Sequence, residues 1–161
     1  MIVGAGPAGL ACAIRLARVS AGALRILVLE KSAQPGGHLL SGAVLRPEAL
    51  KALLTPGEFA ALPLGPVIVR DSFHALTPAR SFRLPFVPPK MRMRGLPLVS
   101  VAELGRALAQ IAATLGVEIL TSQTADALVW KNDRVAGVAT AGEAILAPVT
   151  VLAEGPAGLL S

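Results

Sequence analysis

The stretch IVGAGPAGLACAIRLA at residues 2–17 constrains the fold more than any other part of the chain, because Gly4, Gly6 and Gly9 lie between two apolar segments. Glycines at this density weaken an ordinary helix or strand. In a turn from a strand to a helix, the first glycine allows the bend, the second lets a pyrophosphate approach the backbone, and the third lets helix and strand pack closely. The stretch therefore predicts a dinucleotide-binding turn.

The residues that follow supply the context that such a turn requires. Residues 10–19 carry apolar side chains at helical spacing, and residues 24–29 (LRILVL) are typical of a short buried strand. Glu30 ends this strand 21 residues after Gly9, where an acidic side chain binds ribose hydroxyls in dinucleotide sites. Strand, turn, helix and strand in this order begin a parallel α/β sheet, and these residues leave the choice between NAD and FAD open.

Composition narrows the classes of function. A length of 161 residues with 53% hydrophobic and 3% aromatic residues indicates one domain, residues 1–161, with a light aliphatic core. The net charge of +5 comes from dispersed arginines without interleaved aromatic residues, so we expect no nucleic-acid partner. Cys12 is the only cysteine, which excludes an internal disulfide and a thiolate metal or iron-sulfur site made by this chain alone. We see neither a signal peptide nor a membrane-spanning helix.

The rest of the chain divides into an irregular part and a regular part. Residues 31–98 are Pro-rich and apolar, which predicts an insertion that covers a ligand, with a short helix over 47–54. Ser100 to Glu103 is a capping-box pattern that begins a helix ending at Gly116. The strings VEIL, ALVW, RVAGVAT and EAIL then predict a small meander that leads into a last buried strand at TVLAEG. The predicted class is an α/β Rossmann-like domain with a parallel sheet, crossover helices and a small antiparallel β-meander.

Several longer strings carry a resemblance to a known family. They are IVGAGPAGLACAIRLA, LEKSAQPGGHLLSGAVLRPEAL, LPFVPPKM, LGRALAQIAATLGVEI, AGVAT and TVLAEGPAGLLS. In this order they resemble the N-terminal FAD-binding region of the electron-transfer flavoprotein:ubiquinone oxidoreductase family, and GGHLLSGAVL is the most specific of them. More distantly, the chain is similar to geranylgeranyl reductase and aromatic hydroxylase flavoproteins. The resemblance implies FAD as the cofactor, and it requires no catalytic acid or base because the flavin carries the electrons.

The resemblance also implies where FAD binds. The pyrophosphate would lie on the glycine turn and the adenosine ribose at the end of the second strand, which are formed by Gly4, Gly6, Pro7, Ala8, Gly9, Glu30 and, adjacent to it, Lys31. The loop near the isoalloxazine ring would include Gly37, His38, Ser41 and Gly42. The remaining contacts would come from Arg106 in the later helix, the backbone near Ala125 beside the adenine, and Ala153, Glu154 and Gly155 after the last strand. A lone loop histidine such as His38 is often structural instead.

Two departures from the family pattern concern the cofactor. Pro156-Ala157-Gly158 stands where the family usually has an arginine before the second glycine, and Arg92-Met93-Arg94-Gly95 replaces an Asn-Asn-His-Gly loop. The chain is also shorter than the family, so we expect a fragment. Family members continue into a second FAD motif, a quinone-binding domain and a cysteine cluster for a four-iron four-sulfur centre.

The resemblance implies electron-transfer flavoprotein and ubiquinone as partners of the full enzyme. The expected location is peripheral, on the cytoplasmic side of a bacterial inner membrane or on the mitochondrial inner membrane. LPFVPPKMRMRG either contacts an anionic membrane surface or is a solvated loop that covers the flavin site. Two alternatives stay open for the function, namely a related FAD-dependent reductase or monooxygenase, and a non-catalytic nucleotide-binding fragment.

Overall fold

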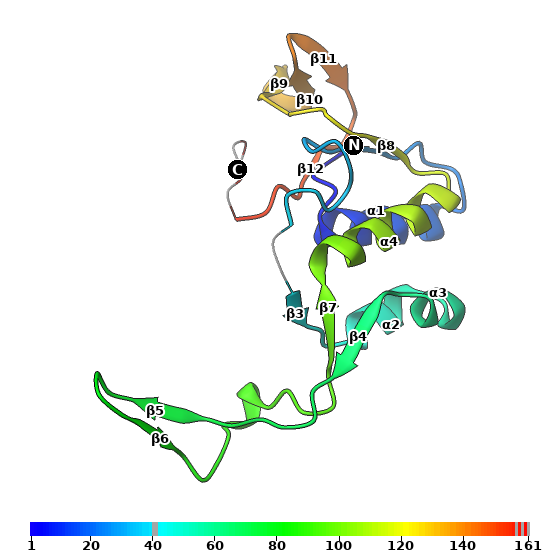
Figure 1. Cartoon of the computed structure of the whole chain (residues 1–161). Coiled ribbons are helices and arrows are strands. Elements are labelled where there is room, and N and C mark those ends of the chain that lie inside the picture. The colour runs from blue at the N-terminus through cyan, green and yellow to red at the C-terminus, as the bar shows by residue number, and fades with distance from the viewer. Residues whose placement is uncertain (40–41, 157, 159, 161) are drawn as a thin grey trace.

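A four-stranded parallel sheet forms the centre of the computed structural model, which describes residues 1–39, 42–156, 158 and 160 (Figure 1). Its order is β12-β1-β2-β8, with the bounds β1 (Ile2–Val3), β2 (Leu27–Leu29), β8 (Glu118–Leu120) and β12 (Val151–Leu152). Ile2 is in register with Val28 on one side and Val151 on the other, so β1 lies inside the sheet. The predicted parallel α/β sheet is confirmed.

Two long helices pack against each other and cover one face of this sheet. Helix α1 (Pro7–Ser20) connects β1 to β2, and α4 (Val101–Thr114) leads into β8. The hydroxyl of Ser100 accepts the N–H of Glu103, so α4 begins where the capping pattern predicts. Apolar side chains of both helices and of the sheet form the main core, whose largest fully buried members are Ile2, Leu10, Ile14, Val28 and Leu108.

A three-stranded antiparallel meander contributes a second, smaller core. Its order is β11-β10-β9, with β9 (Ala127–Lys131), β10 (Arg134–Thr140) and β11 (Glu143–Leu146). The second core consists of Val3, Leu29, Ala125 and Val138. The predicted meander is therefore present, but the string VEIL joins the parallel sheet as β8 instead of the meander.

The expectation of a buried last strand is wrong for β12. Leu152 is 36% exposed, and Val151 is only partly buried. The reason is position, because β12 pairs with β1 on one side and is an edge strand of the described sheet. The apolar sequence of β12 could not indicate an edge position, since apolar runs are typical of the strands of a parallel sheet.

The insertion is more regular than its sequence suggests. It contains an antiparallel sheet in the order β3-β7-β4 and two short helices, with β3 (Gly42–Val44), α2 (Glu48–Leu53), α3 (Pro56–Ala60), β4 (Leu64–Val67) and β7 (Pro97–Ser100). Helix α3 begins at a complete capping box between Thr55 and Glu58, a signal that the prolines and glycines around it obscured. The guanidinium of Arg18 donates to the Leu53 carbonyl and pairs with Glu58, which fixes α2 and α3 to α1.

Residues 68–96, here called the arm, extend away from the body of the molecule (Figure 1). The arm contains a hairpin of β5 (His74–Leu76) and β6 (Ser81–Arg83), followed by a 3-10 turn, η1 (Pro89–Met91). At its base, the Asp71 carboxylate accepts the N–H groups of Met93 and Arg94 at 3.0 and 2.9 Å. The two legs of the arm are thereby joined.

The Arg18–Glu58 pair predicts a dependence of stability on pH. The hydrogen bond from Arg18 holds the pKa of Glu58 below its ordinary value of 4.5, although burial opposes this shift. Because the folded pKa is the lower one, the pair contributes fully above pH 4.5, and its contribution is lost as the pH falls through the folded pKa. We expect Glu58→Gln to lower the free energy of unfolding by about 0.5 kcal/mol at pH 7, within the range measured for ion pairs near the surface, and by less at pH 3.

Chemical denaturation at both pH values measures this difference. Glu143→Gln is the matched control, because the Glu143 carboxylate has no ion pair in the part of the chain that the structure describes. A Glu58→Gln effect of equal size at pH 7 and pH 3 contradicts the prediction.

Candidate functional site

Three glycines of the turn between β1 and α1 have three different environments. Gly4 has a φ of +104°, and a Cβ atom there would lie 2.4 Å from the Ala153 carbonyl oxygen. A Cβ atom at Gly9 would lie 2.0 Å from the Gly4 carbonyl oxygen, so α1 and the turn are in direct backbone contact. Around Gly6 the space is open, since no atom of the described residues other than Gly6 and its chain neighbours lies within 4 Å of such a Cβ. These environments correspond to a bend, a close packing contact and an approach route for a ligand.

The amino end of α1 can hold an anion. Gly6 is its N-cap in an extended conformation and provides no side-chain cap, Pro7 follows at the first helical position, and the first turn has no acidic residue. Ala8 is exposed at the same end. The N–H groups of the first turn therefore have no side-chain acceptor within the part of the chain that the structure describes, and they carry the positive end of the helix dipole. A helix end of this kind, beside an open glycine, suits a phosphate group.

Glu30 stands at the carboxyl end of β2 and is 8% exposed. Its Oε2 accepts the N–H of Ala5 at 2.9 Å, and its Oε1 accepts the N–H and the hydroxyl of Ser32 at 2.8 and 2.7 Å. The side chain thus connects the glycine turn to the end of β2. Lys31 beside it is exposed, and its ammonium forms no hydrogen bond or ion pair within the described ranges.

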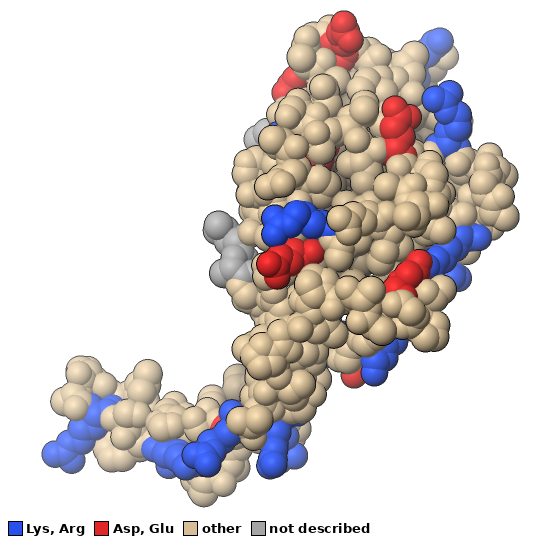
Figure 2. Space-filling model, turned by 45° about the vertical axis from the view of Figure 1, so that its right-hand side comes forward, with Lys and Arg blue, Asp and Glu red and all other residues tan. Residues whose placement is uncertain are grey.

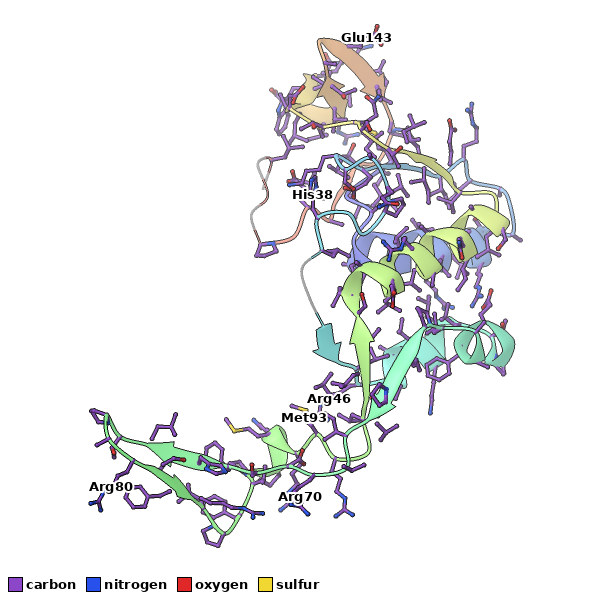
Figure 3. The ribbon with its side chains drawn as sticks, viewed as in Figure 1. His38, Arg46, Arg70, Arg80, Met93 and Glu143 are labelled. Carbon is purple, nitrogen blue, oxygen red and sulfur yellow. The ribbon has the colours of Figure 1, made fainter. Side chains whose placement is uncertain are left out.

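The loop from β2 to β3 packs on α4. A Cβ atom at Gly36 would lie 2.5 Å from the Ala102 carbonyl oxygen, and one at Gly105 would lie 3.4 Å from the Gly36 Cα. Gly37 and His38 are exposed on this loop. Figure 3 labels His38 on it. Gly42 is exposed at the start of β3, whereas Ser41 lies outside the described residues.

The segment after β12 passes directly beside the glycine turn. The N–H of Ala153 donates to the Val3 carbonyl at 2.8 Å, and the Ala153 carbonyl faces Gly4 as described above. Glu154 accepts the N–H of Leu160 at 3.1 Å, and Gly155 has a φ of +82° with open space around it. This segment therefore forms a wall of the candidate site.

Two other residues that the resemblance assigns to the FAD site, Ala125 and Arg106, have different environments. Ala125 is buried in the smaller core against Val3, Leu29 and Val138, so only its backbone is available to a ligand. Arg106 is exposed on α4, and its guanidinium forms no hydrogen bond or ion pair with any described residue. The structure thus brings the turn, Glu30 and Ala153 into contact, and it leaves the side chains of Lys31 and Arg106 in solvent.

Sequence reasoning did not find several residues of this arrangement. Ala5 and Ser32 hold Glu30, and Gly36 and Gly105 bring the β2–β3 loop close to α4. The first glycine of PGG, Gly36, and a glycine inside a strong helix pattern were the only available signals for the loop contact. Nothing in the sequence indicated that a serine two residues after Glu30 folds back onto it.

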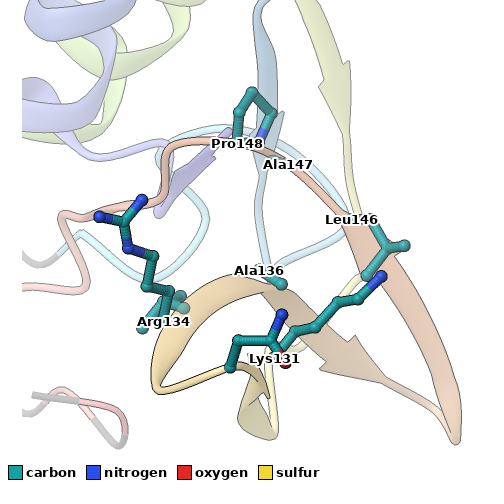
Figure 4. Close-up of a pocket in the computed structure, with 8 residues that line it drawn as sticks. Lys131, Arg134, Ala136, Leu146, Ala147 and Pro148 are labelled. Atoms are coloured by element: carbon teal, nitrogen blue, oxygen red, sulfur yellow. The ribbon is translucent and has the colours of Figure 1, made fainter.

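Two surface hollows lie away from the glycine turn. One, of about 410 Å³, is lined by residues of the β9–β10 turn and of the segment after β11, among them Lys131, Arg134 and Pro148 (Figure 4). The other, of about 470 Å³, lies over the β3-β7-β4 sheet near Gly42 and Glu103. No group of three His, Cys, Asp or Glu side chains within the described residues could hold a metal ion.

The fold and the turn define the class of protein, a Rossmann-like domain. The pattern of the NAD(P)-binding Rossmann-like domain family matches residues 2–73. A geranylgeranyl bacteriochlorophyll reductase-like protein from Thermoplasma acidophilum has a TM-score of 0.67 at 17% identity over 96% of this chain and 38% of its own. CtdE in complex with FAD has a TM-score of 0.64 at 18% identity over 96% of this chain and 37% of its own. These likenesses establish the fold.

The sequence comparison is more specific. A probable electron transfer flavoprotein-ubiquinone oxidoreductase of Schizosaccharomyces pombe is 41% identical over 99% of this chain and 28% of its own length. The electron transfer flavoprotein-ubiquinone oxidoreductase of Pseudomonas aeruginosa is 40% identical over 87% of this chain and 27% of its own length. The resemblance found in the sequence is confirmed, and the chain spans less than a third of these relatives.

The glycine environments predict that two similar substitutions have different effects on stability. Gly9→Ala places a methyl group against the Gly4 carbonyl, so we expect it to lower the free energy of unfolding by about 2 kcal/mol or more. Gly6→Ala meets open space at a φ of −75°, and we expect a change within about 0.5 kcal/mol. Urea denaturation of both variants measures the difference, and equal stability losses contradict the assignment.

Proposed function

We propose that this chain is the FAD-binding part of an electron-transfer flavoprotein:ubiquinone oxidoreductase, with residues 1–161 as one Rossmann-like domain and residues 31–98 as its insertion. In the full enzyme, electrons pass from reduced electron-transfer flavoprotein through FAD and a four-iron four-sulfur cluster outside this chain to ubiquinone. The observation that carries the proposal is the similarity of nearly the whole chain to enzymes of that name, joined to a glycine turn with open space at Gly6.

The described residues fit an FAD molecule. Open space at Gly6 and the uncapped amino end of α1 suit the pyrophosphate, and Glu30 at the end of β2 suits the adenosine ribose. NAD shares the adenosine diphosphate half, so these residues support either ligand. FAD is favoured by the named relatives and by the fold neighbour that is in complex with FAD.

Each part of the chain has a defined task in this proposal. FAD supplies the electron-transfer chemistry when it is bound. The turn and α1 bind its phosphates, Glu30 binds the ribose, and the segment from Ala153 to Gly155 borders the site. The loop with Gly37 and His38 would provide hydrogen bonds near the ring and exclude water, and the solvent-exposed Arg106 side chain on α4 would turn toward the cofactor when it is bound. None of these residues has to transfer a proton.

Retention of FAD by the 161-residue chain tests the proposal. After incubation with FAD and gel filtration, we expect a flavin absorbance band at about 450 nm in the protein fraction. Gly6→Val should abolish the band, because the valine side chain fills the space that the pyrophosphate needs. Gly57→Val is the matched control, since Gly57 in α3 also has open space around it and lies in the insertion.

Two results of this experiment count against the proposal. A flavin band that persists in Gly6→Val contradicts the assignment of the pyrophosphate site. Absence of a band in every folded variant favours the alternative of a nucleotide-binding fragment that does not hold FAD by itself. A related FAD-dependent reductase or monooxygenase is the alternative that the fold neighbours support, and a cysteine cluster further along the parent chain would distinguish the oxidoreductase from it.

We further propose that the arm contacts an anionic membrane surface, and that the enzyme is peripheral, on the cytoplasmic side of a bacterial inner membrane or on the mitochondrial inner membrane. The arm has six Lys or Arg residues and one acidic residue, Asp71. Figure 2 shows basic side chains along it, and Figure 3 shows Arg80 at its far end and Arg70 near its base. Apolar side chains are also exposed there, including Val69 at 80% and Leu76 at 77%.

This combination suits peripheral binding. Each basic residue near an anionic surface contributes about 1 kcal/mol, and exposed apolar side chains can enter the interface. Among the described residues, no helix has both the length and the apolar character needed to cross a bilayer. The arm is therefore the part of the described structure best suited to hold the enzyme at a surface.

Sedimentation with lipid vesicles tests the membrane proposal. We expect the chain to bind vesicles that contain phosphatidylserine and to be released at about 0.5 M salt, because added salt shortens the Debye length from about 10 Å at 0.1 M toward about 3 Å at 1 M. Arg80→Glu combined with Arg83→Glu should reduce binding at least roughly tenfold, since two attractive charges become repulsive. Lys131→Glu combined with Arg134→Glu, on the β9–β10 turn, makes the same change of charge outside the arm. Equal losses in both double variants contradict a role of the arm.

A further inference from the structure

We propose that Ser32 positions the Glu30 carboxylate so that it accepts a single ribose hydroxyl of the bound nucleotide, through Oε2. This inference rests on the nucleotide site proposed above. It adds to that site a positioning residue and the number of ribose hydroxyls that Glu30 accepts. It concerns the adenosine end of the ligand, which FAD, NAD and ADP share.

The geometry around the carboxylate is nearly closed by the protein. Glu30 is 8% exposed and Ser32 is 6% exposed. The Ser32 N–H and Oγ both lie within 2.8 Å of Oε1, and the Ala5 N–H lies 2.9 Å from Oε2. A carboxylate offers about four lone-pair positions, two on each oxygen. Among the described residues, three donors are directed at these positions, so one position, on Oε2, is left for a ligand.

The backbone around Ser32 keeps this arrangement in place. The Ser32 carbonyl accepts the N–H of Ser122 at 2.9 Å, and the Glu30 carbonyl accepts the N–H of Gln123 at 2.9 Å. Both bonds fix residues 30–32 to the segment after β8. Ser32 is thus held at two backbone atoms while its hydroxyl lies against the carboxylate, which is the requirement for an orienting contact.

The Ser32 hydroxyl also contacts the carbonyl of Gln34. A hydroxyl has one proton, so it donates either to Glu30 or to Gln34 at any moment. In both orientations the Oγ atom occupies the space beside Oε1 and keeps a ligand from that oxygen. The same Gln34 carbonyl accepts the N–H of Gly37, so Ser32 also joins Glu30 to the loop that holds Gly37 and His38.

A single accepting position has a consequence for ligand recognition. The ribose of an adenine nucleotide has two free hydroxyls, and a carboxylate with both oxygens open can accept both of them. Here Oε1 is occupied, so Glu30 recognises one hydroxyl only. The site should therefore depend on the 2′-hydroxyl or on the 3′-hydroxyl, but not equally on both.

Calorimetric titration of the 161-residue chain with ADP, 2′-deoxy-ADP and 3′-deoxy-ADP tests this inference. In the unmodified chain we expect one deoxy analogue to bind about tenfold more weakly than ADP, the loss of one hydrogen bond to a charged group, and the other to bind within about twofold. In Ser32→Ala, the ratio between ADP and the weakened analogue should fall to about threefold or less, because the carboxylate is no longer oriented.

The ratio separates positioning from a merely structural role. A structural defect lowers the affinities of all three ligands by the same factor and leaves the ratio unchanged, and that result overturns the role of Ser32. Equal weakening of both deoxy analogues in the unmodified chain overturns the single accepting position. Ser20→Ala, at the end of α1, is the matched control and should keep the unmodified ratio.

A second variant covers the case in which Ser32→Ala does not fold, as judged by circular dichroism. Ser32→Cys keeps the approximate shape of the side chain but replaces the hydroxyl with a weak donor, and it should also lower the ratio. If the unmodified, folded chain binds none of the three ligands, the proposed nucleotide site itself is wrong and this inference fails with it. If ADP binds but the affinities for ADP and its deoxy analogues do not show the expected ratios, only the inference about Ser32 is overturned.

Discussion

The backbone contact between Gly9 and Gly4 is the constraint on which the rest of the structure depends. It lets α1 begin directly beside the end of β1, without side chains in between. The same close approach brings Ala153 against Gly4, so β12 can lie next to β1 and the segment after it can border the turn. A larger residue at either glycine would separate the helix from the sheet and the wall from the site. The candidate site and the core are therefore one packing arrangement.

The sequence predicted those features whose physical cause is local. The glycine spacing, the apolar spacing of α1 and the Ser100–Glu103 pattern each depend on a few neighbouring residues, and each predicted element is present. The position of Glu30 beside the turn could be predicted because it is set by one strand and one helix. Its three protein donors were not found, because Ala5 and Ser32 reach it only after the turn and the β2–β3 loop have folded around it.

Non-local pairing also explains the errors in the fold. Nothing within VEIL distinguishes a strand of the parallel sheet from a strand of the meander, since the choice depends on its pairing with β2. The burial of β12 depends on which strands lie beside it. In the insertion, prolines and glycines indicated loops, yet the capping box at Thr55 and the strand pairing of β3, β4 and β7 produced regular structure.

The bonds from Met93 and Arg94 to Asp71 have a geometric consequence for the whole molecule. Because they join both legs of the arm at its base, the hairpin cannot swing on two independent strands. The direction of the arm is then tied to the β3-β7-β4 sheet from which it emerges, and through β7 and α4 to the sheet that carries the glycine turn. A surface that binds the tip of the arm therefore fixes the orientation of the candidate site relative to that surface, as well as the distance between them.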